Sequence, residues 1–527
     1  MTTDEASSHL GIHLVILHHG LWGHAGHVKF IANEFKKRLG DRLVIYRAQA
    51  NESELTYDGV DLCGQRLVKE VHEVIKVIES GGDIEELRGK KNKKNVKVSK
   101  KDTKDRQHSS DLASIVNTST NSSTNSSTNS STQDLSGIQE ENSAARLKKV
   151  TQFSYLGYSL GGLIGRFAMG MLAEEGFFDE VEPVYFVTMA TPHLGIRQPS
   201  LSNWSKIFNF LSSRMLSRTG EQLQLIDDYV DGRPILLVMS EPSSVFVQAL
   251  ARFKRRALYC NIRNDRSVPF WTASFSDADP FSELDSMDIQ YHSGYSSLIE
   301  SFEHRDLETV ARLEEERLAE WKASSYKDRA THTFKNIPWK KYAFFGLLGP
   351  FLIPIWIIIA SSTISVQGIN SRRRTKELVR TNSELEKIRD KTASIRASHP
   401  SSIQSSTSVA SVEEHHQDQS HITVVSMAKN DSKQASTTSV VETVADSEPA
   451  SFSYPHLKTL RPLALAPFQV EISRNLNQLE WRKNIIHIEA LNAHASIVVR
   501  EKRFSNDGGV AAVQHAVDMF KGDGEDE

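Results

Sequence analysis

Cysteine is almost absent from this chain of 527 residues, which contains only Cys63 and Cys260. Two thiols cannot form a disulfide framework, and so few of them suit a reducing compartment. An excess of one charge is also missing, because 63 basic and 66 acidic residues leave a formal net charge of −3. We therefore expect no nucleic-acid partner. The first residues lack a basic start that leads into an apolar run, so we expect no secretory signal peptide.

Strands and helices alternate along the first 80 residues. A continuous apolar run at 12–19 is typical of a buried strand in a parallel sheet, and 43–46 predicts a second strand. Apolar residues at helical spacing follow each strand, at 28–39 and 60–78. Further strands are expected at 153–156, 184–189, 258–262, 484–488 and 497–499, and further helices at 160–172, 298–321 and 510–520. This alternation predicts an α/β fold with a mostly parallel central sheet.

A G-x-S-x-G motif lies between the strand expected at 153–156 and the helix that follows it. Its residues are Gly157, Ser159 and Gly161. A serine on such a turn has strained backbone geometry and a hydroxyl above the sheet, and the glycines prevent side-chain clashes. The helix directs its positive end at the site, where acyl transfer develops negative charge. We therefore predict that Ser159 is a nucleophile.

A nucleophilic serine needs a base, an acid that orients the base, and two donors for the oxyanion. In α/β-hydrolases the acid and then the histidine follow the serine in the chain. Asp265 comes directly after an expected strand and before a proline-bearing turn, and His494 lies near the C-terminus, so we predict them as acid and base. Gly20 ends the first strand and lets the N–H of Leu21 point into the site. The N–H of Leu160 is the second expected oxyanion donor.

Other titratable residues are weaker candidates. His487 is expected to pack within a strand, His193 to shape the pocket, and Asp58 to cap its helix. An irregular acidic loop holds less suitable carboxylates: Asp277, Asp279 and Asp285. Three histidines cluster near the first strand: His18, His24 and His27. No carboxylate or cysteine joins them at metal-ligand spacing, so we expect no metal and no cofactor.

Five ordered motifs together resemble the fungal serine esterase family that includes lipid-droplet phospholipases and monoacylglycerol lipases. They are HGLWG at 19–23, GYSLGG at 157–162, ATPHLG at 190–195, NDRSVP at 264–269 and NAH at 492–494. The resemblance covers roughly 10–300 and 455–520 and implies an α/β-hydrolase with Ser159, Asp265 and His494 as nucleophile, acid and base. Tyr158 departs from the histidine that many members carry. We expect that side chain to face away from the reacting centre.

Two polar tracts interrupt the expected hydrolase domain, which comprises 1–87, 146–335 and 454–521. Residues 88–145 contain a basic run and three copies of Asn-Ser-Ser-Thr, and their composition predicts a disordered insertion. The basic run could contact an anionic membrane surface or be a solvated loop. Residues 376–453 are expected to be a disordered Ser/Thr-rich linker. Within the hydrolase domain, 200–231 could be a lid or an ordinary packing helix.

Long hydrophobic runs are rare in the sequence, and one lies within 336–375. All nineteen residues of 342–360 are uncharged, with Lys340 and Lys341 before them and three arginines at 372–374. The length is that of a bilayer span, but two prolines near the middle and basic residues on both sides favour a bent segment that enters lipid and returns. A full crossing and a buried core helix remain alternatives.

The expected function is a serine lipase or phospholipase that hydrolyses glycerolipid esters at a membrane or lipid-droplet surface. We expect the catalytic domain to be cytosolic, at a lipid droplet or the endoplasmic reticulum membrane. An esterase of another acyl substrate, such as a protein thioesterase or a glycolipid-anchor deacylase, is the alternative. A membrane-tethered interaction protein with an inactive hydrolase fold is a third possibility, which the intact nucleophile, acid and base disfavour.

Overall fold

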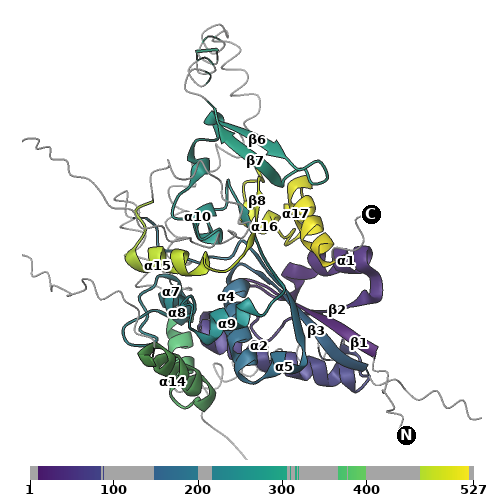
Figure 1. Cartoon of the computed structure of the whole chain (residues 1–527), viewed down its shortest axis with the longest axis vertical. Helices are drawn as coiled ribbons and strands as arrows, with labels where there is room; N and C mark the ends of the chain where they lie inside the picture. The colour runs from purple at the N-terminus through teal and green to yellow at the C-terminus, as the bar shows by residue number, and fades with distance from the viewer. Residues whose placement is uncertain are drawn as a thin grey trace, which may run out of the picture.

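Six parallel strands form the central sheet, in the order β2-β1-β3-β4-β5-β8 (Figure 1). The computed structural model describes residues 10–84, 148–199, 217–305, 366–376, 378–398 and 463–521, with a few single residues between these ranges. The strands are β1 (Leu10–His18), β2 (Leu43–Arg47), β3 (Lys148–Tyr158), β4 (Glu182–Met189), β5 (Arg255–Asn261) and β8 (Arg482–Ile486). A separate antiparallel pair consists of β6 (Met287–Tyr291) and β7 (Ile299–His304). The predicted α/β fold with a mostly parallel sheet is confirmed.

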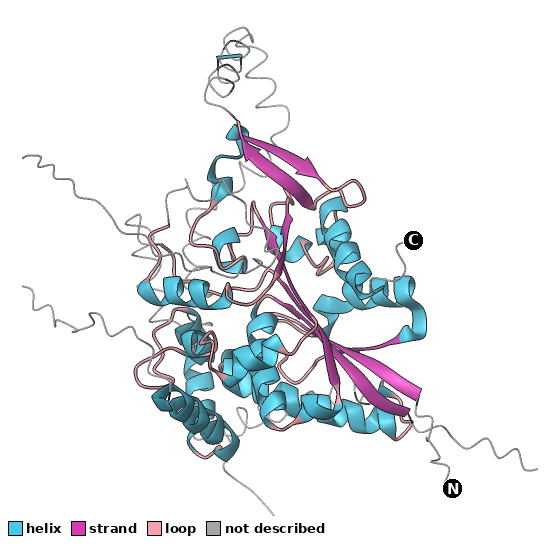
Figure 2. Cartoon of the chain, in the orientation of Figure 1, coloured by secondary structure: helices cyan, strands magenta, loops and turns pink. Residues whose placement is uncertain are grey.

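Helices cover both faces of the sheet (Figure 2). One face packs against α1 (Lys29–Leu39) and α17 (Asp507–Asp518). The other face packs against α2 (Val60–Glu79), α4 (Leu160–Glu174) and α9 (Val245–Ala251). Further α-helices are α5 (Phe177–Glu180), α7 (Arg218–Leu223), α8 (Ile235–Val238), α10 (Phe270–Ala273), α14 (Ser383–Ser398), α15 (Pro467–Leu476) and α16 (Ala493–Ser496).

The continuous apolar run of β1 is explained by burial on both faces. Leu14 and Ile16 belong to the core cluster on the side of α2 and α4, whereas Val15 and Leu17 belong to the cluster on the side of α1 and α17. All four side chains are fully buried. Successive residues of a strand point to opposite faces, so a strand covered on both sides needs apolar residues at every position.

Two predicted elements are wrong in whole or in part. The start of the helix expected at 298–321 is instead strand β7, because Ile299 and Phe302 are buried there and the backbone pairs with β6. Most of 306–321 lies outside the described residues, and the few described residues within it are helical. The strand expected at 497–499 is a turn after α16, in which Ile497 and Val498 are buried in the core without a strand partner. These residues are apolar because they are buried. A run of β-branched residues can occur in a buried turn as well as in a strand, so the run alone does not identify a strand.

The structure describes parts of two regions that the sequence left without a defined fold, the expected linker at 376–453 and the possible lid at 200–231. Helix α14 lies within the expected linker at 376–453, and Leu385 and Ile388 bury one side of it. Residues 200–216 of the expected lid lie outside the described part of the chain. The remainder of that lid contains the short helix α7 and a β-bridge between Val230 and Arg233, so it is not one continuous helix.

The insertion at 88–145 and the apolar segment at 342–360 also lie outside the described residues. Among the helices that the structure does describe, none is both long enough and apolar enough to cross a membrane. The helical residues 366–376, which follow the apolar segment, are described and contact the hydrolase core. Arg372 pairs there with Glu221 of α7 at 2.7 Å.

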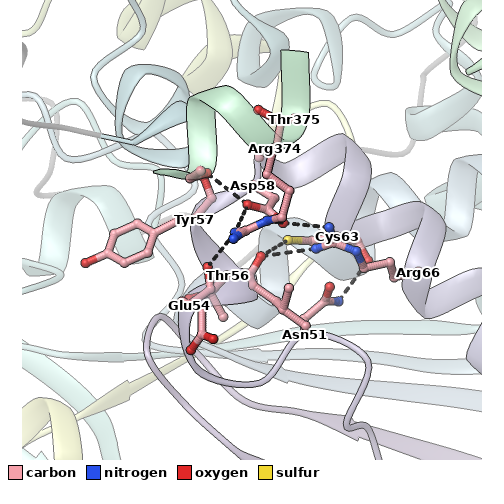
Figure 3. A network of polar contacts seen from close by, with 12 residues as sticks. Asn51, Glu54, Thr56, Tyr57, Asp58, Cys63, Arg66, Arg374 and Thr375 are labelled. Carbon is pink, nitrogen blue, oxygen red and sulfur yellow. Dashed lines mark hydrogen bonds and ion pairs between the residues drawn. The ribbon is translucent and has the colours of Figure 1, made fainter. Parts of the chain in front are cut away.

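A buried carboxylate holds this helical segment in place (Figure 3). Asp58 is not the cap that the sequence predicted, because α2 begins after Gly59 and the Asp58 side chain points elsewhere. Its carboxylate is fully buried and accepts hydrogen bonds from Arg66 Nη2 at 2.6 Å, Arg374 Nε at 3.2 Å and Ser371 Oγ at 2.8 Å. Two guanidinium groups compensate for the loss of hydration of one carboxylate, which is a common requirement for a buried charge.

We expect Asp58→Ala to lower the free energy of unfolding by about 3 kcal/mol, because it leaves two arginines facing each other without their anion. The matched control is Asp179→Ala, which removes an exposed ion pair with Arg252 and should cost less than about 1 kcal/mol. Urea unfolding at 25 °C measures both. Equal destabilisation by the two variants would contradict a structural role for the Asp58 cluster.

Candidate active site

The three residues predicted to carry the chemistry follow strands whose carboxyl ends lie at one edge of the sheet. Ser159 directly follows β3, Asp265 lies in the loop after β5, and His494 lies in α16, after β8. Strand β8 pairs with β5, so the loops that carry Asp265 and His494 are neighbours. Parallel α/β sheets bind their ligands at this edge.

Ser159 has a backbone conformation that L-residues rarely adopt, with φ 55° and ψ −127°. Hydrogen bonds on both sides hold it there. Its N–H donates to the carbonyl of Met189 at 2.9 Å, and its carbonyl accepts from the Gly162 N–H at 3.1 Å and the Thr191 hydroxyl at 2.9 Å. Such strain costs about 1–3 kcal/mol and persists only where the surroundings enforce it.

The predicted motif glycines lie where no side chain fits. A Cβ on Gly157 would be 2.6 Å from a backbone nitrogen of α4, and a Cβ on Gly161 would be 2.6 Å from the carbonyl oxygen of His19. A Cβ on Gly20 would be 2.6 Å from the Cβ of Ser159. The end of β1, the turn and the start of α4 therefore approach one another at backbone distance.

A continuous chain of hydrogen bonds joins the predicted nucleophile, base and acid. His494 Nε2 lies 3.0 Å from Ser159 Oγ, and His494 Nδ1 lies 2.8 Å from Asp265 Oδ2. The second carboxylate oxygen, Oδ1, accepts the backbone N–H groups of Ser267 at 3.1 Å and Val268 at 2.8 Å. A neutral imidazole with its proton on Nδ1 donates to the carboxylate and accepts from the serine. The structure brings the three residues together, and their catalytic roles stay predictions.

The loops that carry the acid and the base are tied to each other. The Asn261 side chain accepts the N–H of Ile488 at 2.7 Å, and Asn264 Nδ2 donates to the carbonyl of Glu489 at 3.0 Å. Asn492 caps the short helix α16 through its side chain. Asn264 and Asn492 begin two of the sequence motifs, but none of the three asparagines was assigned a role from the sequence. Asparagine in the loops that follow strands is the available signal, because its side chain bonds readily to nearby backbone.

Tyr158 does not face away from the site, and that prediction is wrong. Its hydroxyl donates to the backbone carbonyl of His494 at 2.8 Å, and its ring centroid lies 5.1 Å from that of the imidazole. As the last residue of β3, Tyr158 points to the same face as Leu156, where Ala493 of α16 is also buried. Side chains alternate between the two faces of a strand, so the sequence alone indicated that Tyr158 lies on the same face as Leu156.

The two predicted oxyanion donors are adjacent to Ser159. Leu160 is the first residue of α4, so its N–H is one of the helix amides that have no partner within the helix. Leu21 follows Gly20 in a tight turn closed by the Gly23 N–H on the Gly20 carbonyl at 3.0 Å. The next residue, Trp22, has φ 53° and donates its N–H to a threonine hydroxyl of the loop before α2.

The other histidines considered from the sequence lie outside the hydrogen-bond chain. His18 and His19 are buried against backbone carbonyls, and burial lowers the pKa of each so that both imidazoles are neutral. His193 is fully buried and its Nε2 bonds to the Thr188 hydroxyl at 3.0 Å. His487 bonds to the hydroxyl of Tyr291. Within the described residues, no three His, Cys, Asp or Glu side chains are placed to hold a metal ion.

Neither cysteine is a candidate nucleophile. Cys63 and Cys260 are buried and unpaired with each other, and burial raises the pKa of each thiol to about 12. The alternative acids lie outside the hydrogen-bond chain or the described side chains. Asp277 is exposed, the Asp279 side chain accepts the N–H of Phe281, and the side chain of Asp285 is not described.

The chain belongs to the family described as "Putative serine esterase (DUF676)", whose model matches residues 8–99 and 92–278. This range includes Ser159 and Asp265 and ends before His494. The family and the architecture together support a hydrolase with a parallel sheet and flanking helices, as in α/β-hydrolases.

Curated relatives in two yeasts carry names of the same class. The chain is 36% identical over 136 residues to "Putative lipase C4A8.10" of Schizosaccharomyces pombe, a match that covers 25% of this chain and 17% of the relative. It is 39% identical over 129 residues to "Putative lipase ROG1" and 40% identical over 137 residues to "Putative lipase YDL109C", both of Saccharomyces cerevisiae. These two matches cover 24% and 26% of this chain, and 18% and 20% of the relatives. The chain thus spans at most a fifth of the length of these relatives, which support a hydrolase.

The strain at Ser159 predicts an unusual stability order. Ser159→Gly should be more stable than Ser159→Ala by about 1 kcal/mol, because relief of the strain exceeds the extra chain entropy of glycine. Thermal unfolding of both variants measures the difference. Ser240, which is buried and does not have positive φ, supplies the control pair. There the alanine variant should be the more stable one, and the same order at both positions would contradict strain at Ser159.

Proposed function

We propose that the protein is a serine carboxylic ester hydrolase that cleaves glycerolipid esters through an acyl-enzyme. The observation that carries the proposal is the hydrogen-bond chain from Ser159 through His494 to Asp265. A serine, a histidine and a carboxylate in this order are the machinery of acyl transfer on several unrelated folds.

In the acylation step, Ser159 Oγ attacks the ester carbonyl carbon while His494 Nε2 takes the hydroxyl proton. The carbonyl π electrons move to oxygen, and the N–H groups of Leu21 and Leu160 stabilise the resulting oxyanion. The intermediate then collapses, the bond to the alcohol oxygen breaks, and His494 returns its proton to that oxygen. The alcohol leaves and the acyl group stays on Ser159.

Water completes the cycle by the same steps in the second half-reaction. His494 takes a proton from water, the hydroxide attacks the acyl carbon, and the proton returns to Ser159 Oγ as the carboxylic acid forms. Asp265 keeps the imidazole in the tautomer with its proton on Nδ1 and stabilises the imidazolium. The two amides on Asp265 Oδ1 leave the other oxygen free to face His494.

Two exposed apolar side chains beside the site support a lipid substrate. Trp22 is 50% exposed and follows the oxyanion candidate Leu21, and Leu491 is 87% exposed on the loop that leads to His494. Apolar side chains at the edge of a site are surface that a lipid chain can bury when it binds. The names of the yeast relatives agree with this substrate class. Another acyl ester, such as a protein thioester or a glycolipid anchor, is the alternative.

We propose that the site of action is a membrane or lipid-droplet surface, with the catalytic domain on the cytosolic side. The support is the uncharged run at 342–360, which has enough apolar area to bind lipid at roughly 25 cal/mol per Å². Arg372 and Arg374, which follow this run, pair with Glu221 and Asp58, so the helical residues after the run are fixed to the hydrolase core.

We expect Ser159→Ala and His494→Ala to reduce ester hydrolysis to similar residual rates, because nucleophile and base act as a unit. Asp265→Asn should also lose most activity, since it disturbs the orientation of the imidazole. Assays of purified protein on a panel of glycerolipid, thioester and short-chain esters measure this. A fluorophosphonate probe should label the wild type and the Ser240→Ala control but not Ser159→Ala. Labelling of Ser159→Ala at the wild-type rate would remove Ser159 from the mechanism.

Removal of 342–360 should release the protein from membranes and lower hydrolysis of emulsified lipid, with a soluble ester cleaved at the wild-type rate. Residues 366–376 are kept in this variant because they pack on the core. Removal of the nineteen polar-rich residues at 121–139, which begin with the Asn-Ser-Ser-Thr repeat, is the matched control, and it should change neither activity nor fractionation. If both deletions fractionated like the wild type, 342–360 would not be a lipid anchor.

A further inference from the structure

The side chain of Tyr158 joins the strand that presents the nucleophile to the helix that presents the base. Its hydroxyl donates to the backbone carbonyl of His494 at 2.8 Å. Its ring lies beside the imidazole, with the ring centroids 5.1 Å apart and the planes tilted by 35°. The side chain is buried, at 2% exposure, so solvent does not compete for this hydrogen bond.

The tyrosine is well placed to fix the distance between base and nucleophile. Its backbone pairs with Met189 of β4, and Ser159, the next residue, donates its N–H to the carbonyl of the same methionine. Tyr158, which holds the backbone of the base, is therefore the immediate neighbour of the nucleophile Ser159 in the chain. Burial raises the pKa of the Tyr158 hydroxyl, which keeps it protonated and able to donate at any pH at which the imidazole is a base.

The base needs such an anchor because its own helix is short. Helix α16 has four residues, and the carbonyls on either side of His494 accept backbone amides of the turn that follows. The His494 carbonyl instead accepts the Tyr158 hydroxyl. Asp265 holds the far end of the imidazole, and Tyr158 holds the backbone from which the ring extends. Two points of support define the position of Nε2 better than one.

We propose that Tyr158 is a positioning residue for His494, and that its hydroxyl sets the alignment of Nε2 with Ser159 Oγ. Tyr158 contacts the base and not the reacting atoms, so it acts on the rate of proton transfer and not on substrate binding. Small displacements of catalytic groups lower rates steeply. The inference rests on the hydrolytic function proposed above.

Tyr158→Phe is the direct test, because it removes the hydroxyl and retains the ring. With a soluble ester, kcat should fall about tenfold and KM should stay within about twofold, since binding contacts are unchanged. The rate constant for fluorophosphonate labelling of Ser159 should fall by the same factor as kcat. A loss of packing alone would lower the melting temperature and leave the kcat of the folded fraction unchanged.

Tyr259→Phe is the matched control. Tyr259 is also fully buried, within the central strand β5, and its hydroxyl bonds to His515 Nδ1 at 2.7 Å, away from the hydrogen-bond chain of the site. This variant should lower the melting temperature by a similar amount with kcat unchanged. Equal kcat for Tyr158→Phe and wild type would overturn the positioning role, and so would an equal loss of kcat in both variants. A wild type that cleaves no ester of the panel would overturn the proposed function, and this inference with it.

Discussion

The close contact between the end of β1, the turn at Ser159 and the start of α4 is the constraint on which the site depends. Gly161 lies against the backbone carbonyls of His18 and His19, and Gly20 lies against Ser159 itself. Only glycine permits this approach, and the approach in turn maintains the strained conformation of Ser159. Helix α4 is buried on all sides from Leu160 to Leu172, so the surrounding packing, more than local preference, holds the turn.

The base reaches this turn only because of a second constraint, the pairing of β8 with β5. That pairing places the acid loop beside the base loop, and the side chains of Asn261 and Asn264 then bond to the backbone of the loop after β8. Three contacts meet at His494, from Ser159, Asp265 and Tyr158. Ser159, Asp265 and Tyr158 all lie at or just beyond the ends of strands in one rigid sheet. The sheet therefore keeps their positions precise even where the residues lie on loops.

The proximity of Ser159, Asp265 and His494 could be predicted because parallel strands bring the loops at their carboxyl ends together whatever the length of chain between them. The contact between Tyr158 and His494 was not predicted, because Tyr158 was only compared with the family motif. Counting alternate residues along the strand from Leu156 places it on the face where α16 packs. Helix α14 was missed because two buried apolar residues, Leu385 and Ile388, among charged residues are a weak signal before the surface they cover is known. The strand β7 was missed for a related reason, since its pairing with β6 decided its conformation.

The separation of 229 positions between Asp265 and His494 shows why chain distance is a poor guide to this site. The entropy of closing a loop grows only with the logarithm of its length, so a long insertion between β7 and β8 has a small effect on the approach of β8 to β5. Part of this insertion also bonds to the core, through Arg374 on Asp58 and Lys391 on Glu174. These contacts fix the described residues within 366–398 to the core. The insertion can therefore carry an apolar segment without loosening the strand that positions the base.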